Sequence, residues 1–218
     1  MIDKIFIINL KHRSDRRKKI IKNLNNQNID PSHYEFFDGI RPTIDDIQLW
    51  NENFCKHVIQ DVVPKKRDKY LIGTLGCLKS HVEIVKLALK RNYTNILIFE
   101  DDTEFIRNFE DVLLFSKQIN YYDMLYLSGS HLGSKIKVSE NLMKVEGTYT
   151  TGSYLISKTG MEFLVNNIQG YEKEIDVFYA TVLQNKLKCY CTFPHITKQS
   201  DGYSDIQQNL VSYELLQK

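Results

Sequence analysis

Short apolar runs alternate with amphipathic segments along the chain, a pattern typical of a layered α/β fold. Strands are predicted at residues 4–9 (KIFIIN), 34–37, 95–99 (NILIF), 124–127, 153–156 and 189–193. Helices are predicted at about 14–24, 80–91 and 109–119, and two more begin near residues 159 and 174. We therefore expect one domain over residues 1–218, with a central, mostly parallel sheet flanked by helices.

Three segments lack a clear period. Residues 42–70 end in a charged run (KKRDK) and are expected to form an irregular, mobile connection, and no strand is predicted beyond Pro194. Residues 73–81 (GTLGCLKSH) are interpreted as a glycine-containing loop that enters a helix capped by Ser80. A helix N-terminus suits anions, but the glycine spacings of the known phosphate loops are absent, so a tight packing turn is the alternative.

Composition narrows the function classes. A chain of 218 residues that is 42% hydrophobic and 26% charged, with 10 Gly and 4 Pro, is neither disordered nor collagen-like. Its 29 basic and 27 acidic residues give a net charge of +2, which argues against a nucleic-acid partner. The four scattered cysteines suit free thiols, and the apolar run at the N-terminus is too short for a signal peptide or a membrane span. We expect a soluble, cytoplasmic protein without a transmembrane segment.

Three carboxylates, Glu100, Asp101 and Asp102, directly follow the strongest predicted strand. Ligands of open α/β sheets bind beyond the carboxyl ends of the strands, and adjacent carboxylates repel one another unless a cation lies between them. A hard divalent ion such as Mg²⁺ or Mn²⁺ would fit there and could bridge to a diphosphate. The alternative is a solvated turn in which an aspartate caps the next helix.

Other charged residues have two interpretations each. The basic residues of the first turn and helix could meet a phosphate, form a solvated helix face or attract an anionic membrane surface; they are Arg13, Arg16, Arg17, Lys18, Lys19 and Lys22. Glu174 and Asp176 lie near a helix start, where negative charge is favourable in itself. His195 could be a metal ligand or an ordinary loop histidine.

Several segments in order resemble glycosyltransferase family 25, the lipopolysaccharide and collagen galactosyltransferase group. They span nearly the whole chain and are IFIINLKHRSDRR, GTLGCLKSH, ILIFEDD, YDMLYLSG, TTGSYLISKTGMEFL and PHITKQSDGYSDI. The resemblance implies a GT-A-like nucleotide-binding sandwich, a UDP-sugar donor, Mn²⁺ or Mg²⁺, and inverting transfer to an acceptor hydroxyl.

The resemblance also implies roles for individual residues. Asp102, with Asp101, would hold the metal and the diphosphate, while Glu100 would orient the turn or contact the donor. Asp176 would be the catalytic base, with Glu174 as the fallback. The remaining candidates would surround the donor: Asn9, Arg13 and Arg16 near the nucleotide, Asp38 at the ribose or uracil, and Ser80 and His81 in the pocket wall. His195 is a further candidate metal ligand, and Gln199, Ser204 and Asp205 match the C-terminal block without an assigned role.

Substrates and alternatives stay open at this stage. The donor hexose could be galactose or glucose, and the acceptor could be a lipooligosaccharide, hydroxylysine or another glycan. The length is closer to that of bacterial lipooligosaccharide enzymes than to that of the larger collagen-modifying relatives. A bacterial source and a viral source both stay open. Two other functions compete: a metal-dependent nucleotidyl- or phosphotransferase, and a non-catalytic nucleotide-sugar-binding scaffold.

Overall fold

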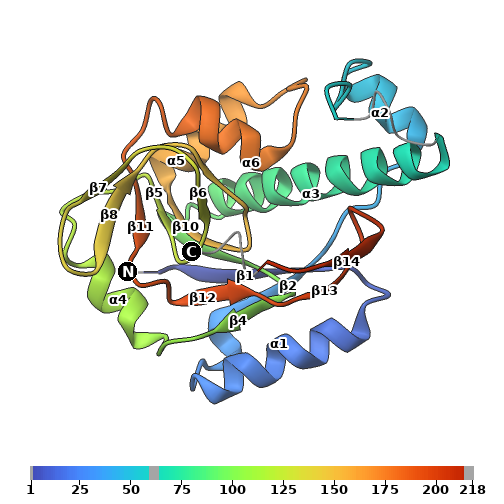
Figure 1. Ribbon diagram of the computed structural model, residues 1–218. Helices are drawn as coiled ribbons and strands as arrows, with labels where there is room; N and C mark the ends of the chain where they lie inside the picture. Colours follow the sequence, from blue (N-terminus) through green and yellow to red (C-terminus); the bar gives the residue numbers. More distant parts are fainter. Residues whose placement is uncertain (1, 59–63, 214–218) are drawn as a thin grey trace.

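The structure is a computed structural model that describes residues 2–58 and 64–213, and an eight-stranded sheet forms its centre (Figure 1). The strand order is β2-β1-β3-β10-β5-β11-β8-β7. The strands are β1 (Lys4–Asn9), β2 (Tyr34–Asp38), β3 (Asn95–Glu100), β5 (Met124–Tyr126), β7 (Lys135–Lys137), β8 (Leu142–Val145), β10 (Ser153–Ser157) and β11 (Cys189–Thr192).

The sheet is mixed, and its parallel half positions the acidic residues. Strand β1 runs parallel to β2 and β3, and β5 runs parallel to β11, whereas β10, β8 and β7 pair antiparallel with their neighbours. Asn9 is in register with Asp38, and Ile8 is in register with Glu100. The carboxyl ends of three neighbouring strands therefore lie at one edge of the sheet.

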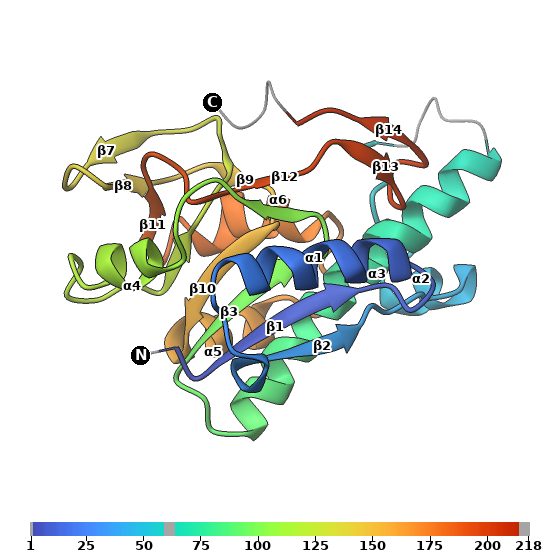
Figure 2. The ribbon, with the colours of Figure 1, turned by 90° about the horizontal axis from the view of Figure 1, so that it is seen from below.

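Helices cover both faces of the sheet (Figures 1 and 2). Alternate side chains of a strand point to opposite faces, so Ile5 and Ile7 belong to one core and Phe6 to the other. The first core includes α1 (Ser14–Asn26) and α4 (Glu110–Ser116). The second contains α3 (Pro64–Lys90), α5 (Lys158–Asn167) and α6 (Ile175–Phe178), with α2 (Ile44–Trp50) against α3. The predicted α/β sandwich is thereby confirmed.

The prediction for residues 42–81 is wrong in two respects. Helix α2 lies within the segment expected to be irregular, and α3 begins at Pro64, while residues 59–63 lie outside the described part. Residues 73–81 are therefore the middle of a helix of 27 residues, and Ser80 is not an N-cap. Its hydroxyl instead donates to the Gly76 carbonyl one turn earlier, at 2.7 Å. Glycines lower helix propensity, and tertiary contacts override that preference here.

Short strands also lie where none was predicted. After Pro194, β12 (Thr197–Gln199) pairs with β4 (Thr103–Phe105), and β13 (Gly202–Ser204) pairs with β14 (Asn209–Val211). A further small pair joins β6 (Ser130–His131) and β9 (Thr148–Tyr149). Strands of two or three residues are too short to show a period of two, so the sequence pattern could not reveal them.

The remaining elements are a short helix at Pro31–His33 and a π-helical turn, η2 (Tyr179–Leu183), directly after α6. All four cysteines are free thiols. Within residues 2–58 and 64–213, no helix has both the length and the apolar character that crossing a bilayer requires.

Candidate active site

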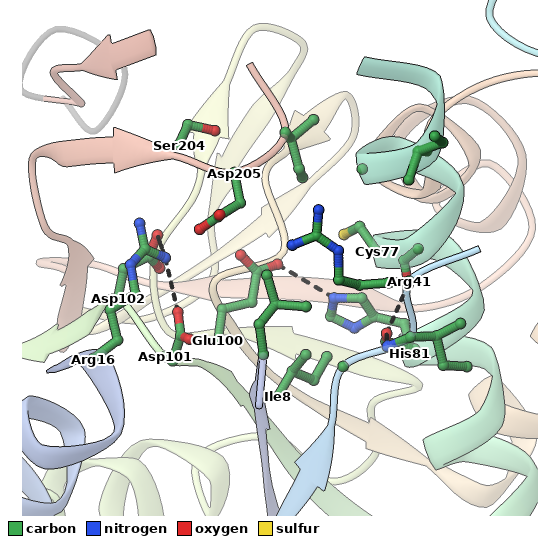
Figure 3. A pocket seen from close by; sticks show the side chains of 18 of the residues that line it. Ile8, Arg16, Arg41, Cys77, His81, Glu100, Asp101, Asp102, Ser204 and Asp205 are labelled. Carbon is green, nitrogen blue, oxygen red and sulfur yellow. Dashed lines mark hydrogen bonds and ion pairs between the residues drawn. The ribbon is translucent and has the colours of Figure 1, made fainter. Parts of the chain in front are cut away.

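A cavity of about 120 Å³ opens at the edge where β1, β2 and β3 end (Figure 3). Its lining comes from the end of β1, Arg16 of α1, the residues after β2, the middle of α3, the acidic residues 100–102, residues 204–206 of the C-terminal hairpin (β13 and β14) and Tyr213. This is the location that the strand-end rule predicts for a ligand.

Asp101 is buried, and both of its carboxylate oxygens have partners. Oδ2 accepts a hydrogen bond of 2.7 Å from the Asn9 side chain, and Oδ1 lies 2.8 Å from Arg16 Nη1. Burial nevertheless raises the pKa of Asp101, although Arg16 and Asn9 oppose the shift. Asn9 and Arg16 thus hold this carboxylate in a fixed position at the strand end.

Asp102 differs from its neighbour in one respect that matters for binding. Its Oδ2 lies 3.3 Å from Arg16 Nη1, but its Oδ1 is buried and has no hydrogen-bond partner in the part of the chain that the structure describes. Burial, together with the charge of Glu100, raises the pKa of Asp102 to about 7, against the influence of Arg16. A buried carboxylate oxygen without a partner is costly unless a ligand or cation satisfies it.

Glu100 is held from two sides. Its Oε1 accepts from Thr151 at 2.6 Å and lies 3.2 Å from His81 Nε2, while Gln199 reaches Oε2 at 3.5 Å. Burial favours the neutral acid, but these contacts, His81 foremost, outweigh it and lower the pKa of Glu100. Glu100 is therefore a fixed negative charge in the cavity wall.

His81 connects this charge to the core. It is fully buried, and its Nδ1 lies 2.7 Å from the Tyr154 hydroxyl, which in turn lies 2.9 Å from the Tyr179 hydroxyl. The two tyrosines come from β10 and η2, so the imidazole that faces Glu100 is oriented by a central strand of the sheet and by the turn after α6.

A second cavity of about 310 Å³ adjoins the first, and it contains Glu174 and Asp176. The residues that line both cavities are Cys77, Glu100, Ser204, Ile206 and Tyr213. Two neighbouring spaces with shared lining residues can hold two ligands side by side.

Asp176 and Glu174 differ in their surroundings. Among the described residues, Asp176 accepts hydrogen bonds from two backbone groups, at 3.3 Å from Thr150 N and 2.9 Å from Val177 N. Burial and the nearby charges of Glu174 and Glu100 raise the pKa of Asp176. Glu174 instead accepts from the Tyr70 hydroxyl at 2.7 Å and lies 3.4 Å from His57 Nε2.

The basic residues of α1 do not act as one group. Arg16 lines the first cavity, whereas Arg13 pairs with Asp15 and with Asp205 of the C-terminal hairpin. Arg17 stacks over the Phe36 ring at 3.7 Å, and Lys19 pairs with Glu104 at 2.6 Å. Most of these basic side chains therefore make contacts within the fold and do not form one free basic surface.

The other predicted site residues are dispersed. Ser80 and His81 line the first cavity, as expected, but Asp38 is exposed at the end of β2 and is not among the lining residues. His195 is buried beside His131, with their Nε2 atoms 3.1 Å apart, and lines neither cavity. Within the described chain, the structure therefore places His195 in a different cluster from Asp101 and Asp102.

The glycines of residues 73–81 shape the cavity wall rather than bind an anion through a loop. A Cβ on Gly76 would lie 2.4 Å from the Ile40 carbonyl oxygen, and one on Gly73 would lie 2.9 Å from the Ile206 Cα. The segment after β2 and the C-terminal hairpin thus approach α3 closely only because both positions lack a side chain.

Comparison with known proteins identifies the family of the chain. Residues 2–179 match the family model described as Glycosyltransferase family 25 (LPS biosynthesis protein). The chain belongs to glycosyltransferase family 25. Procollagen galactosyltransferase 2 of Homo sapiens is 30% identical over 84% of this chain and 30% of its own length. "Inactive glycosyltransferase 25 family member 3" of Mus musculus is 27% identical over 75% of this chain and 28% of its own length.

The family 25 chain described here thus spans less than a third of these curated relatives. Among solved structures, that of mannose-1-phosphate geranyltransferase from Thermus thermophilus gives a TM-score of 0.47 at 10% identity, over 94% of this chain and 76% of that one.

Sequence reasoning missed several residues of this family 25 site. Thr151 and Arg41 contribute to the cavities; Thr151 belongs to a segment that carries the family resemblance but had no assigned role, and Arg41 belongs to none of these segments. Gln199 and Asp205 were noted without a role, and they contact Glu100 and Arg13. Only tertiary contacts between segments far apart in the chain bring these side chains to the site.

Proposed function

We propose that this chain is a divalent-metal-dependent, inverting hexosyltransferase. It moves galactose or glucose from a UDP-sugar to a hydroxyl of a glycan, lipooligosaccharide or hydroxylysine acceptor. The observation that carries the proposal is Asp102, whose buried Oδ1 lacks a partner within the described residues and whose side chain lines the first cavity. Membership of family 25 supports the reaction class.

The donor set suits a hard cation. Carboxylate oxygens are preferred ligands of Mn²⁺ and Mg²⁺, so Asp102 Oδ1 would be the first protein ligand, and Asp101 would assist from beside it. When bound, such an ion stabilises the negative charge that develops on the departing diphosphate. Arg16, 3.3 Å from the other oxygen of Asp102, would add positive charge on the same side.

Asp176 is proposed as the base. Its raised pKa gives the carboxylate a higher proton affinity than an exposed aspartate, and its place in the second cavity suits contact with an acceptor hydroxyl. The backbone hydrogen bonds from Thr150 and Val177 fix its direction. Glu174 is the weaker candidate because Tyr70 and His57 already engage it.

The first test is thermal unfolding with UDP, with and without Mn²⁺, and again with excess EDTA. At about a hundred times its dissociation constant, a ligand stabilises the native state by about 2.7 kcal/mol, which a melting experiment detects. We expect a UDP shift that requires Mn²⁺ in the wild type and is absent in Asp102→Asn. A metal-dependent shift of full size in Asp102→Asn would contradict the metal assignment.

Asp176→Asn separates binding from chemistry. The variant should keep the Mn²⁺-dependent UDP shift, because Asp176 lies outside the first cavity, and lose sugar transfer by roughly 10²- to 10⁴-fold in kcat. Glu174→Gln is the matched control and should retain most of the transfer. Normal transfer by Asp176→Asn, with loss in Glu174→Gln, would move the base to Glu174.

A non-catalytic sugar-nucleotide-binding role is the second candidate, because a similar relative carries the name of an inactive family member. Such a protein would show the UDP shift without releasing UDP from any of a panel of UDP-sugars. Release of UDP, assayed enzymatically, supports transfer. Release of pyrophosphate instead would indicate a nucleotidyltransferase.

A further inference from the structure

A second cluster of ligand-type side chains lies outside both cavities. His131 from β6, Cys191 from β11 and His195 each offer one ligand atom, and these three atoms all lie within 4.8 Å of one another. Cys191 and His195 are buried, at 1% and 8% exposure, and His131 is half-buried. The proposed transfer reaction, as derived above, uses none of the three.

The two imidazoles face each other through the same type of atom. His131 Nε2 and His195 Nε2 are 3.1 Å apart, and the Thr148 hydroxyl lies 2.8 Å from the opposite nitrogen of His131, Nδ1. A hydrogen bond at Nδ1 fixes the ring orientation, as outer-shell partners of metal-bound histidines do. The contact places both Nε2 atoms within reach of a single ion.

Both histidines are uncharged at neutral pH. Burial is the main cause at both residues. At His131, burial and the charges of His195 and Lys135 lower the pKa to about 4. At His195, burial and the charge of Lys135 lower the pKa to about 4. Burial raises the pKa of the Cys191 thiol, an effect that Lys135 partly offsets. The cluster therefore presents two neutral imidazoles and one thiol, with Lys135 as the charged group that acts on all three.

The spacing and chemistry suit a borderline-soft ion. In a tetrahedral zinc site, Zn–N distances of about 2.0–2.1 Å place two nitrogens roughly 3.3–3.4 Å apart, close to the observed separation. Imidazole and thiolate are the ligands that Zn²⁺ prefers, whereas the carboxylates of the first cavity suit Mn²⁺ or Mg²⁺. In the other ligand-type group found in the described chain, Cys77, His81 and Glu100, the Tyr154 hydroxyl engages one His81 nitrogen and Glu100 the other, whereas the partner of His131 Nε2 is itself a ligand atom, His195 Nε2.

We propose that His131, Cys191 and His195 form a Zn²⁺ site, with water as the fourth ligand on the half-exposed His131 side. Binding exchanges the Cys191 S–H bond for a Zn–S bond and releases one proton to solvent, with no change of oxidation state. Each imidazole donates an Nε2 lone pair; the ring that carries the proton of the Nε2–Nε2 hydrogen bond transfers it to its own Nδ1, so neither imidazole loses a proton overall.

A Zn²⁺ ion bound here would link three segments of the chain next to the second cavity. In β6, His131 is adjacent to Ser130, which lines that cavity, and successive side chains of a strand point to opposite sides. Cys191 and His195 lie just before β12, whose Gln199 reaches Glu100. Zinc would thus hold the β6–β9 pair and the approach to β12 in place, independently of whether the chain transfers sugar.

Metal binding by the full chain tests the site directly. Chelator-treated protein is titrated with Zn²⁺ against a competing indicator, and with Co²⁺ while the thiolate-to-cobalt charge-transfer absorption is recorded. We expect stoichiometric Zn²⁺ binding and a charge-transfer band in the wild type. Both should persist in Cys77→Ser, the control for the other cluster, and the band should disappear in Cys191→Ser.

Two further variants keep the test decisive if Cys191→Ser does not fold. His131→Gln changes a half-exposed residue and should weaken Zn²⁺ binding by more than 100-fold, since loss of a ligand exceeds the roughly 10- to 100-fold effect of outer-shell changes. Thr148→Val, which removes only the hydroxyl at Nδ1, should fall within that smaller range. The proposal is overturned if the wild type shows no charge-transfer band, or if the band survives in His131→Gln and vanishes in Cys77→Ser.

Discussion

At the scale of single residues, the acidic triplet shows how neighbours in sequence acquire different roles. Asp101 is satisfied by Asn9 and Arg16, Glu100 is fixed by His81 and Thr151, and Asp102 alone keeps a buried oxygen without a partner within the described residues. A carboxylate in this state costs stability in the metal-free protein and supplies a ready ligand atom for a cation. Binding ability and stability are therefore opposed at Asp102.

That opposition predicts a pH dependence of the free energy of unfolding. The pKa of Asp102 is raised from an ordinary 3.8 to about 7, so between these values the folded state holds a proton that the unfolded state has lost. Stability from this group must then fall as the pH rises through that interval. With EDTA present, Asp102→Asn should be more stable than the wild type at pH 8, by on the order of 2–4 kcal/mol, and similar to it near pH 4.

Urea denaturation of both proteins at pH 4.5 and pH 8 checks this expectation. Asp101→Asn is the comparison variant: burial also raises the pKa of Asp101, but Arg16 and Asn9 oppose the shift, so its gain in stability at pH 8 should be smaller than that of Asp102→Asn. Equal stability of the wild type and Asp102→Asn at pH 8 would show that the Asp102 carboxylate is well solvated.

At the scale of elements, helix α3 combines the core and the site. Its apolar positions, such as Leu75, Leu78 and Val82, are buried against the sheet, while Cys77 and His81 face the cavities. The two glycines lower its helix propensity but permit the close approach of the segments that complete the cavity wall. Contacts on several sides of α3 therefore restrict which residues its positions can contain.

Gly76→Ala should therefore destabilise the protein although alanine favours helices. The gain in propensity is about 1 kcal/mol, but the added Cβ would lie 2.4 Å from a backbone carbonyl oxygen, which forces Ile40 or α3 to move. We expect a net loss of about 1–2 kcal/mol in the free energy of unfolding and weaker UDP binding. Lys69→Ala, at an exposed position of α3, is the control and should change stability by less than about 0.5 kcal/mol. A stabilised Gly76→Ala would show that the contact yields easily.

At the scale of the whole molecule, the C-terminal hairpin folds back over the beginning of the chain. Asp205 pairs with Arg13, the Tyr203 carbonyl accepts from Arg16 at 2.7 Å, and Ser200 contacts Lys19 at 3.0 Å (Figure 2 shows the hairpin beside α1). These contacts join residues about two hundred positions apart in sequence and close the first cavity on one side.

Asp205→Asn should loosen this closure without unfolding the core. The pair is partly buried, so its loss leaves Arg13 with Asp15 alone and should increase proteolytic cleavage after residue 200. Mn²⁺-dependent UDP binding should weaken by roughly 10-fold, the equivalent of about 1.4 kcal/mol. Asp15→Asn removes the other, more exposed partner of Arg13 and should leave both properties nearly unchanged. Identical effects of the two variants would argue against a specific role for the hairpin.

By itself, the sequence determined the layered α/β class, the positions of the long strands and the acidic residues at the end of β3. Buried strands and amphipathic helices leave a local record of period and apolarity, and parallel strand ends define where a ligand can bind. The tertiary structure decided the rest: that residues 73–81 lie inside α3, that His195 meets His131, and that within the acidic triplet it is Asp102 whose buried oxygen has no hydrogen-bond partner among the described residues. These outcomes depend on which side chains from distant segments come within hydrogen-bond distance, and a local pattern contains no information about such approaches.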